Sequence, residues 1–525
     1  MRYLRTMLLA AATSAIALSA AAQELVIGRA NEPQSIDPQF SRTGNNQMTS
    51  LHIFDRLILT DANVRPMPGL AVEWEAEDDT TWLVRLREGV TFHDGSPFTA
   101  ADVVYSLERA PDVPNSPASF AGSVANLASS EIVNDHTIRF TTTTPDPLFI
   151  QNIGTVYIVS QAAAEGAANE DFNSGQAAIG TGPYEFVSWS PGDRLQLIRN
   201  DAYWGDSPAF ETVTMRFIAN DAARVAALLS DAVDLIDLVP PADLPNLREN
   251  PDISVYDTPT VRLIYLALNQ AEDAPGLTDT AGNPMDVNPL QDARVRRAIS
   301  MMIDRQAIID RLFYGAGEAA SQIVPTGVFG YNPDIPVAPF DPEGAQALLA
   351  EAGYPDGFGI TIYGSNDRFS QDGELTQVLG QFLARGGLTV NGVETLPYAV
   401  YAQEAGNNAY GAFLFSYGNS TGEASRGLLS AIHSRDEEAN LGSLNRFSYA
   451  NPAFDAAVVA AAQIFDDEAR EAALAASQMI PFGEDTALVP LYFQALSWAS
   501  RADVEYEPRR DERTLAMGAR PAGAN

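Results

Sequence analysis

Residues 82–87 alternate between more apolar and more polar side chains, with Trp82, Val84 and Leu86 on one side of the alternation. A period of two is typical of a β-strand whose more apolar face is buried. The tripeptide His-Asp-Gly at residues 93–95 has turn composition. We therefore predict a strand that ends in a turn.

The helix expected after this turn has a clear start signal. Thr99 suits the N-cap position, and Asp102 stands three residues later, at the spacing of a capping box. Phe98 is placed to contact Val103 as a hydrophobic staple. The apolar positions then repeat at helical spacing, so we predict an amphipathic helix that ends near residue 109.

Similar patterns predict elements along the rest of the chain. Two nearly continuous apolar runs, residues 262–269 and 488–494, have the length of strands that are buried on both faces. The other predicted elements are a strand at 131–142, a hairpin around the Pro-Gly-Asp turn at 191–193, a helix at 222–229, a strand at 233–239, one long helix at 292–315, and a helix beginning near 341.

Residues 82–109, preceded by Pro-Gly-Leu-Ala at 68–71 and by Trp74, resemble the signature of the family 5 extracellular solute-binding proteins. These proteins are the dipeptide, oligopeptide and nickel receptors of bacterial ABC importers. A second string, IGTGPYEFVSWSPGDRLQLIRNDAYWGDSP from residue 179, and later strings in the same order extend the resemblance over nearly the whole mature chain.

The resemblance implies an α/β fold of the two-lobed periplasmic binding protein type, type II-like, with an additional domain in the first lobe. The strands at 262–269 and 488–494 would be the two crossover strands of the hinge. The implied division is a signal peptide at 1–22, lobe 1 at 23–58, the appended domain at 59–180, lobe 1 again at 181–266, lobe 2 at 267–490, and a return to lobe 1 at 491–525.

The first 22 residues have the pattern of a secretory signal peptide. Arg2 and Arg5 form a positive start, residues 7–18 are apolar, and small residues end the segment at Ala22. We expect cleavage near Ala22 and a periplasmic protein that is not itself embedded in the membrane. The chain has no cysteine, which excludes a disulfide framework and an N-terminal lipid anchor on cysteine.

The charge narrows the range of partners. The 68 Asp and Glu residues outnumber the 32 basic residues, the formal net charge is -36, and every basic residue is an arginine. A chain with this net negative charge repels nucleic acid and anionic lipid. We therefore expect neither of them as a partner. The absence of lysine also excludes Schiff-base chemistry and a P-loop.

Catalytic patterns are missing from the sequence. It contains no HExxH, CxxC or Ser-x-x-Lys motif, and the four histidines are scattered. We expect no enzymatic activity, no cofactor and no metal site. His93 is more readily explained by a hydrogen bond to loop backbone than by metal or proton chemistry.

The best candidate for a binding site is the stretch at 413–429, where an apolar strand runs into a loop rich in Gly, Ser, Thr and Asn. Peptide receptors of the family carry in this segment a tryptophan and an aspartate that pairs with the peptide amino terminus. Here Tyr417 stands near the tryptophan position and the aspartate is missing. Asn419 brings no charge, and Glu423 could supply the carboxylate.

Two arginines could bind a ligand carboxylate or phosphate, because a guanidinium group matches two oxygens. These are Arg368, which follows a predicted strand, and Arg446; the alternative for each is an internal salt bridge. Tyr417 has core packing as its alternative role. The full set of predicted ligand-binding residues is Asn45, Asn366, Arg368, Tyr417, Asn419, Thr421, Glu423 and Arg446.

The resemblance implies a monomeric periplasmic receptor that captures a small organic ligand between its lobes and delivers it to the permease and ATPase of an importer. A di- or oligopeptide is the default ligand. The alternatives are a non-peptide ligand, such as an opine, sugar conjugate or metal chelate, and, more distantly, a secreted hydrolase. A second role in chemoreception stays open.

Overall fold

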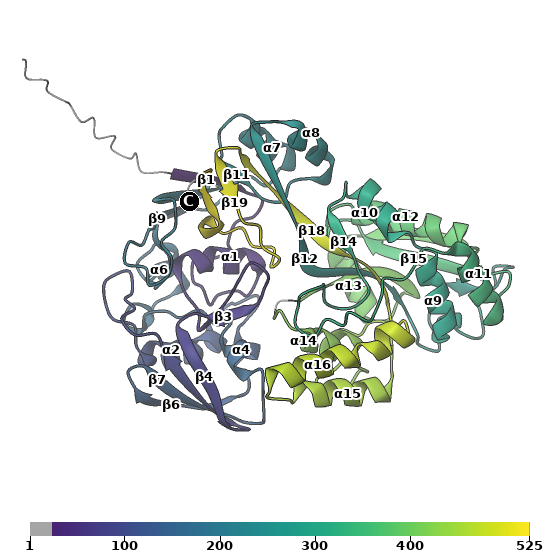
Figure 1. Ribbon diagram of the computed structural model, residues 1–525, viewed down its shortest axis with the longest axis horizontal. Helices are drawn as coiled ribbons and strands as arrows, with labels where there is room; N and C mark the ends of the chain where they lie inside the picture. Colours follow the sequence, from purple (N-terminus) through teal and green to yellow (C-terminus); the bar gives the residue numbers. More distant parts are fainter. Residues whose placement is uncertain (1–23, 420, 524–525) are drawn as a thin grey trace, which may run out of the picture.

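The computed structural model describes residues 24–419 and 421–523, so the predicted signal peptide and its cleavage site lie outside the described residues. Two lobes lie side by side, and two long strands, β12 (Ile253–Leu268) and β18 (Val489–Arg501), pass between them (Figure 1). None of the helices in these ranges has the length and apolar character to cross a membrane.

One large mixed sheet extends through both lobes. Its strands, in spatial order, are β13 (Leu277–Thr278), β15 (Gly359–Ser365), β17 (Ala412–Gly418), β12, β18, β11 (Leu235–Ile236), β1 (Glu24–Arg29), β10 (Thr212–Phe217), β9 (Arg194–Arg199) and β8 (Tyr184–Ser190), with β14 (Gly317–Ala319) beside β18 and β16 (Thr389–Leu396) beside β15. Lobe 1 holds the strands from β11 to β8, and lobe 2 holds those from β13 to β17.

The crossing strands β12 and β18 are antiparallel to each other along most of their length. The first part of β12, up to Pro259, pairs with residues 495–501, and the register then shifts before Leu263 pairs with Phe493. From Val261 onward most residues of β12 are buried, as their apolar run predicts. The two predicted crossover strands are confirmed, and the register shift lies where the chain passes from one lobe to the other.

Lobe 1 contains a smaller antiparallel sheet in the order β4 (Ala71–Asp78), β5 (Thr81–Leu86), β7 (Thr137–Thr142) and β6 (Leu127–Asn134). Nearby is the strand pair β2 (Ile58–Thr60) and β3 (Pro66–Pro68), and the C-terminal part adds β19 (Val504–Tyr506) and β20 (Ala519–Pro521). The small sheet falls within the predicted appended domain at 59–180; the domain boundaries themselves stay a prediction.

Helices cover both sheets. Lobe 1 has α1 (Gly44–Ile53), α2 (Ala100–Arg109), α3 (Ala121–Val124), α4 (Phe149–Ile153), α5 (Gln161–Ala164), α6 (Asn169–Asn173), α7 (Asp221–Leu229) and α8 (Leu244–Glu249). Lobe 2 has α9 (Ala293–Met301), α10 (Arg305–Leu312), α11 (Pro342–Glu351), α12 (Asp372–Arg385), α13 (Tyr398–Gly406), α14 (Ala424–Gly427), α15 (Pro452–Ala462) and α16 (Asp467–Ser477).

The strand, turn and helix predicted for residues 82–109 are confirmed as β5, a turn and α2. At the start of α2 the Asp102 carboxylate accepts hydrogen bonds from the backbone and the hydroxyl of Thr99, at 2.9 and 3.1 Å. His93 lies in the turn, where its Nε2 is 3.0 Å from the Gly182 carbonyl oxygen and its Nδ1 accepts from the Gly180 backbone at 3.3 Å. The expectation that His93 binds loop backbone is also confirmed.

Three predicted elements are wrong in extent. Residues 131–142 are two strands, β6 and β7, because the Asn134 side chain accepts the His136 backbone N–H at 2.9 Å and closes a turn. Residues 292–315 are two helices, because Asp304 accepts the Ala307 backbone N–H at 2.9 Å and starts α10 anew. The strand predicted at 233–239 is only the two residues of β11.

Candidate ligand-binding cleft

A cleft of about 600 Å³ lies between the lobes, next to β12 and β18. Its lobe 1 side includes Asn45 and Met48 of α1 and the C-terminal loop at 511–514. Its lobe 2 side includes Phe313 and the segment at 368–370. Since the two walls belong to different lobes, a molecule in the cleft would contact both.

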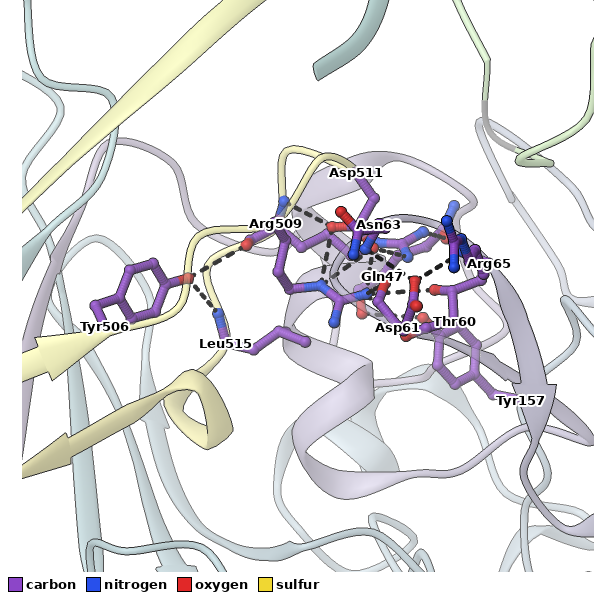
Figure 2. A network of polar contacts seen from close by, with 11 residues as sticks. Gln47, Thr60, Asp61, Asn63, Arg65, Tyr157, Tyr506, Arg509, Asp511 and Leu515 are labelled. Atoms are coloured by element: carbon purple, nitrogen blue, oxygen red, sulfur yellow. Dashed lines mark hydrogen bonds and ion pairs between the residues drawn. The ribbon is translucent and has the colours of Figure 1, made fainter. Parts of the chain in front are cut away.

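The C-terminal loop is held in the cleft by a network of charged groups (Figure 2). The Arg509 guanidinium donates to the Thr60 and Asp61 carbonyl oxygens at 3.0 and 2.9 Å and to the Asp511 carboxylate at 2.7 Å. Arg513 donates to Asp511 at 2.9 Å and to the Gln47 side chain at 2.6 Å. Residues more than 440 positions apart are thereby fixed together.

Asp511 is the centre of this network. Burial by itself would raise the pKa of the Asp511 carboxyl, but the charges of Arg513 and Arg509, together with their hydrogen bonds, outweigh it and hold the pKa below its usual value. The carboxylate is therefore ionised at neutral pH and keeps both arginines in place.

Glu512 and Arg262 link the loop to the hinge. Two N–H groups of Arg262, on β12, donate to the two carboxylate oxygens of Glu512 at 2.8 and 3.0 Å. Both residues line the cleft. A bidentate pair of this kind fixes the orientation of the guanidinium as well as its position.

A third part of the wall is formed by residues 237–241 after β11. The carboxylate of Asp237 is buried and lies 3.9 Å from Arg29 and 3.8 Å from Arg224. Burial raises the pKa of Asp237, and the charge of Arg29 and a hydrogen bond from the Ala30 backbone only partly oppose this. The Asp237 carboxylate thus already interacts with groups of its own lobe.

On the lobe 2 side, Arg368 is exposed and lies over the Tyr398 ring, with 5.0 Å from its guanidinium carbon to the ring centre. Its backbone N–H donates to Asp372 at 2.9 Å, so the turn after β15 is held by the first residue of α12. Arg446 is half-buried and lies 4.7 Å over the Phe415 ring of β17. Both guanidinium groups are positioned by aromatic faces.

The structure brings only part of the predicted site together. Asn45 and Arg368 line the cleft, and the exposed Asn366 lies two residues from Arg368. Tyr417 is almost fully buried within lobe 2. Thr421 lines a separate small pocket, together with Val64 and Arg513, where the lobes touch.

Asn419 and Glu423 are also buried in lobe 2. The Asn419 side chain donates to the Glu423 carbonyl oxygen at 2.9 Å and accepts the Thr421 hydroxyl at 3.0 Å, so the loop binds itself. The Glu423 carboxylate lies 3.5 Å from the buried Arg470 of α16. Burial raises the pKa of Glu423, and its carboxylate faces Arg470 inside the lobe and not the cleft.

Several cleft residues were missed by the sequence reasoning: Asp237, Arg262, Asp511, Glu512 and Arg513. The run Arg-Arg-Asp-Glu-Arg at 509–513 was a usable signal, because it places three arginines and two acids within five residues. Within the described ranges, no three His, Asp or Glu side chains gather as a metal site.

A sequence model described as bacterial extracellular solute-binding proteins, family 5 Middle, matches residues 65–438. The dipeptide-binding protein of Escherichia coli (strain K12) is 28% identical over 375 residues, which is 66% of each chain. Heme-binding protein A of Haemophilus influenzae is 27% identical over 86% of this chain and 84% of that protein. The glutathione-binding protein GsiB of E. coli (strain K12) is 27% identical over 91% and 90%.

Among solved structures, HbpA2 of Haemophilus parasuis is similar to this chain with a TM-score of 0.82 and 24% identity, over 95% of this chain and 99% of that one. At this identity the likeness establishes the shared fold. The two-lobed α/β architecture is thus the one expected from the sequence.

Proposed function

The chain belongs to the bacterial extracellular solute-binding proteins of family 5, and from this premise we propose that its cleft captures a peptide or peptide-like solute. Members of the family are the binding components of ABC importers. The observation that carries the proposal is the cleft itself, whose walls come from two lobes joined by β12 and β18.

The ligand class rests on the relatives and on the chemistry of the cleft. Two of the relatives are named for binding a dipeptide and glutathione, and a third for binding heme. The cleft offers Arg368 for a carboxylate and the Asn45 side chain as a hydrogen-bonding group. Such groups suit a small polar ligand with a carboxylate at one end.

Ligand binding is coupled to the closure of the two lobes. A ligand that contacts both walls binds the closed arrangement more tightly than the open one, so it shifts the population toward closure. On this proposal, two residues of lobe 2 lie beside the ligand, namely Arg446 and Asn366. Four others shape the loop behind the ligand: Tyr417, Asn419, Thr421 and Glu423.

The closed complex would deliver its ligand to a permease driven by a separate ATPase, and the protein would act as a monomer in the periplasm after cleavage near Ala22. The relatives are binding proteins of transporters, and we propose no catalytic step for this chain.

Thermal unfolding of the mature protein tests the ligand class. A ligand that binds only the folded state, at a concentration of about 100 times its Kd, adds about 2.7 kcal/mol to the free energy of unfolding. We expect a rise in Tm with peptides of two to five residues and none with free sugars. If no peptide raises Tm at saturating concentration, the peptide assignment is wrong.

A variant links this response to the cleft. Arg368→Gln removes the exposed guanidinium of the lobe 2 wall, and we expect peptide affinity to fall about tenfold, as for the loss of one charged hydrogen bond. Arg385→Gln, an exposed arginine on the outer side of α12, serves as the matched control. Equal affinity of both variants would remove Arg368 from the site.

A further inference from the structure

Arg56, between α1 and β2, is a buried arginine whose guanidinium group forms no hydrogen bond with residues 24–419 or 421–523. The residue is 4% exposed, its Nε is fully buried without a partner, and no carboxylate oxygen of these ranges lies within 4 Å of it. The other buried arginines each donate at least one guanidinium hydrogen bond: Arg29, Arg224, Arg296, Arg305 and Arg470. Among the buried arginines of the described chain, Arg56 is therefore the exception.

The Arg56 guanidinium keeps its charge in this position. Burial lowers the pKa of Arg56 to about 10, which still leaves the group protonated at neutral pH. Its contact with the Tyr157 ring, at 5.6 Å from the guanidinium carbon to the ring centre, involves the ring face and no hydrogen bond. A buried charge is costly unless an opposite charge or polar groups compensate it.

Arg56 lines a pocket of about 40 Å³ at the place where the lobes touch. The other residues of the wall are Ile58, Thr60, Val64, Pro66, Gln151, Gly154, Thr155, Thr421 and Arg513. The wall thus contains two arginines and no Asp or Glu, and Thr60 and Gln151 add a hydroxyl and an amide donor. A pocket of this volume has room for one small ion or a few water molecules.

The carboxylates nearest to Arg56 along the chain and in the neighbouring network have other partners. Asp511 is paired with Arg509 and Arg513. The Asp55 carboxylate accepts hydrogen bonds from Trp204 and Thr181. The Asp61 carboxylate accepts the backbone N–H groups of Asn63 and Arg65. The chain itself therefore leaves the charge of Arg56 without a counterion.

We propose that this pocket binds a small inorganic monovalent anion, such as chloride, with the Arg56 guanidinium as its charged donor. Thr421 is the wall residue that comes from lobe 2, so the pocket is complete only where the lobes touch. Arg513 lies in the walls of both this pocket and the cleft, but the pocket is too small for a peptide. The anion site does not depend on the ligand class proposed for the cleft.

The line width of the chloride NMR signal tests the site in solution, because chloride that exchanges with a protein site gives a broader signal. The formal net charge of -36 keeps non-specific chloride binding low. With the mature protein and no peptide, we expect a broadening that saturates with chloride and is displaced by bromide. Sodium gluconate, whose anion is too large for the pocket, keeps the ionic strength constant and should not displace chloride.

Arg56→Met removes the charge and keeps the length of the side chain. Chloride affinity should fall at least about tenfold, as for the loss of a charged hydrogen bond. Arg65→Gln, an exposed arginine shortly after Arg56, is the matched control and should leave chloride affinity unchanged.

Thermal unfolding separates an anion site from a merely structural role of Arg56. The native protein should have a higher Tm in chloride than in gluconate at equal ionic strength, and Arg56→Met should have the same Tm in both. In gluconate the variant should be at least as stable as the native protein, because it removes an uncompensated buried charge. A structural role would lower the Tm of the variant equally in both salts.

Crystals of the native protein grown in sodium bromide locate the anion and need no variant. We expect an anomalous bromide peak in contact with the Arg56 guanidinium. If that peak is missing and the chloride signal shows no saturable broadening, water solvates Arg56 and the proposal is wrong. If Arg65→Gln lowers chloride affinity as much as Arg56→Met does, the binding reflects the general charge of this surface and not the pocket.

Discussion

Gly422 stands where the two lobes touch, and only a residue without a side chain fits there. Its φ is +70°, and an added Cβ would collide with the carbonyl oxygen of Val64 in lobe 1. Val64 is itself buried, at 2% exposure, and has a φ of 67°, which is unusual for a β-branched residue. The contact is thus built from two backbone conformations that few residues adopt.

Gly422→Ala should lower the free energy of unfolding by about 3 kcal/mol, from left-handed strain plus the collision. Gly166→Ala is the matched control, because Gly166 has a φ of +75° and no atom within 4 Å of the added Cβ. The control should lose only about 1 kcal/mol. Urea denaturation measures both, and equal losses would show that the contact with Val64 costs nothing.

At the scale of elements, the end of α1 carries two buried titratable groups with opposite responses to acid. His52 accepts the Ala516 backbone N–H at 3.0 Å, while its other ring nitrogen is 2.8 Å from the Met48 carbonyl oxygen. Burial lowers the pKa of His52 to about 4. Asp55, three residues after His52, accepts the Trp204 indole N–H at 2.7 Å, and burial raises its pKa to about 6.

Whether stability rises or falls with pH follows from the number of protons that the folded and unfolded states bind. Between about pH 6.5 and 4 the unfolded chain binds a proton at His52 that the folded protein does not, so stability is lost on acidification. Between about pH 6 and 4 the folded protein binds a proton at Asp55 that the unfolded chain does not, so stability is gained. Each effect is about 3 kcal/mol, and the two nearly cancel.

Asp55→Asn should reveal the effect of His52 on stability, which Asp55 nearly cancels in the native protein. The amide oxygen of the variant still accepts from Trp204 but cannot titrate. Relative to the native protein, the variant should lose about 3 kcal/mol of stability between about pH 7 and pH 4. His52→Gln should show the opposite slope. Urea denaturation over a pH series checks this, and a difference that does not change with pH would contradict the buried state of Asp55.

The helices and strands also show which elements can be predicted from short sequence patterns. The capping residues Thr99 and Asp102 and the alternation at 82–87 predicted α2 and β5 correctly, because caps and periodicity act within a few residues. The break between α9 and α10 was missed, since the apolar pattern continues through it; Asp304 caps α10 at this break.

At the scale of the whole molecule, Arg510 joins the lobes outside the crossing strands. Its backbone N–H donates to the Ala62 carbonyl oxygen of lobe 1 at 2.9 Å. Its guanidinium donates to the Thr326 carbonyl oxygen of lobe 2 at 2.9 Å and to the Pro259 carbonyl oxygen of β12 at 3.1 Å. These bonds restrain the opening of the lobes about the hinge.

Arg510→Ala keeps the backbone bond to Ala62 but loses the guanidinium bonds to Thr326 and Pro259. The ligand-free variant should be more open, because this loss removes about 1 kcal/mol of restraint. Small-angle X-ray scattering should then give a larger radius of gyration than the native protein without ligand and the same radius with saturating peptide. Arg520→Ala, which breaks only an exposed pair with Glu505, is the control. An unchanged radius without ligand would mean that the strands alone set the opening.

The sequence by itself determined the family, the crossing strands β12 and β18, and most elements, because alternation, apolar runs and capping residues are local properties. It also indicated Asn45 and Arg368, which line the cleft. Only the tertiary structure decided that the loop at 509–513 forms a cleft wall, since its partners Thr60 and Asp61 lie more than 440 residues earlier. It likewise decided the orientation of Glu423, because a carboxylate turns toward the nearest buried arginine, here Arg470, and no local pattern records which one that is.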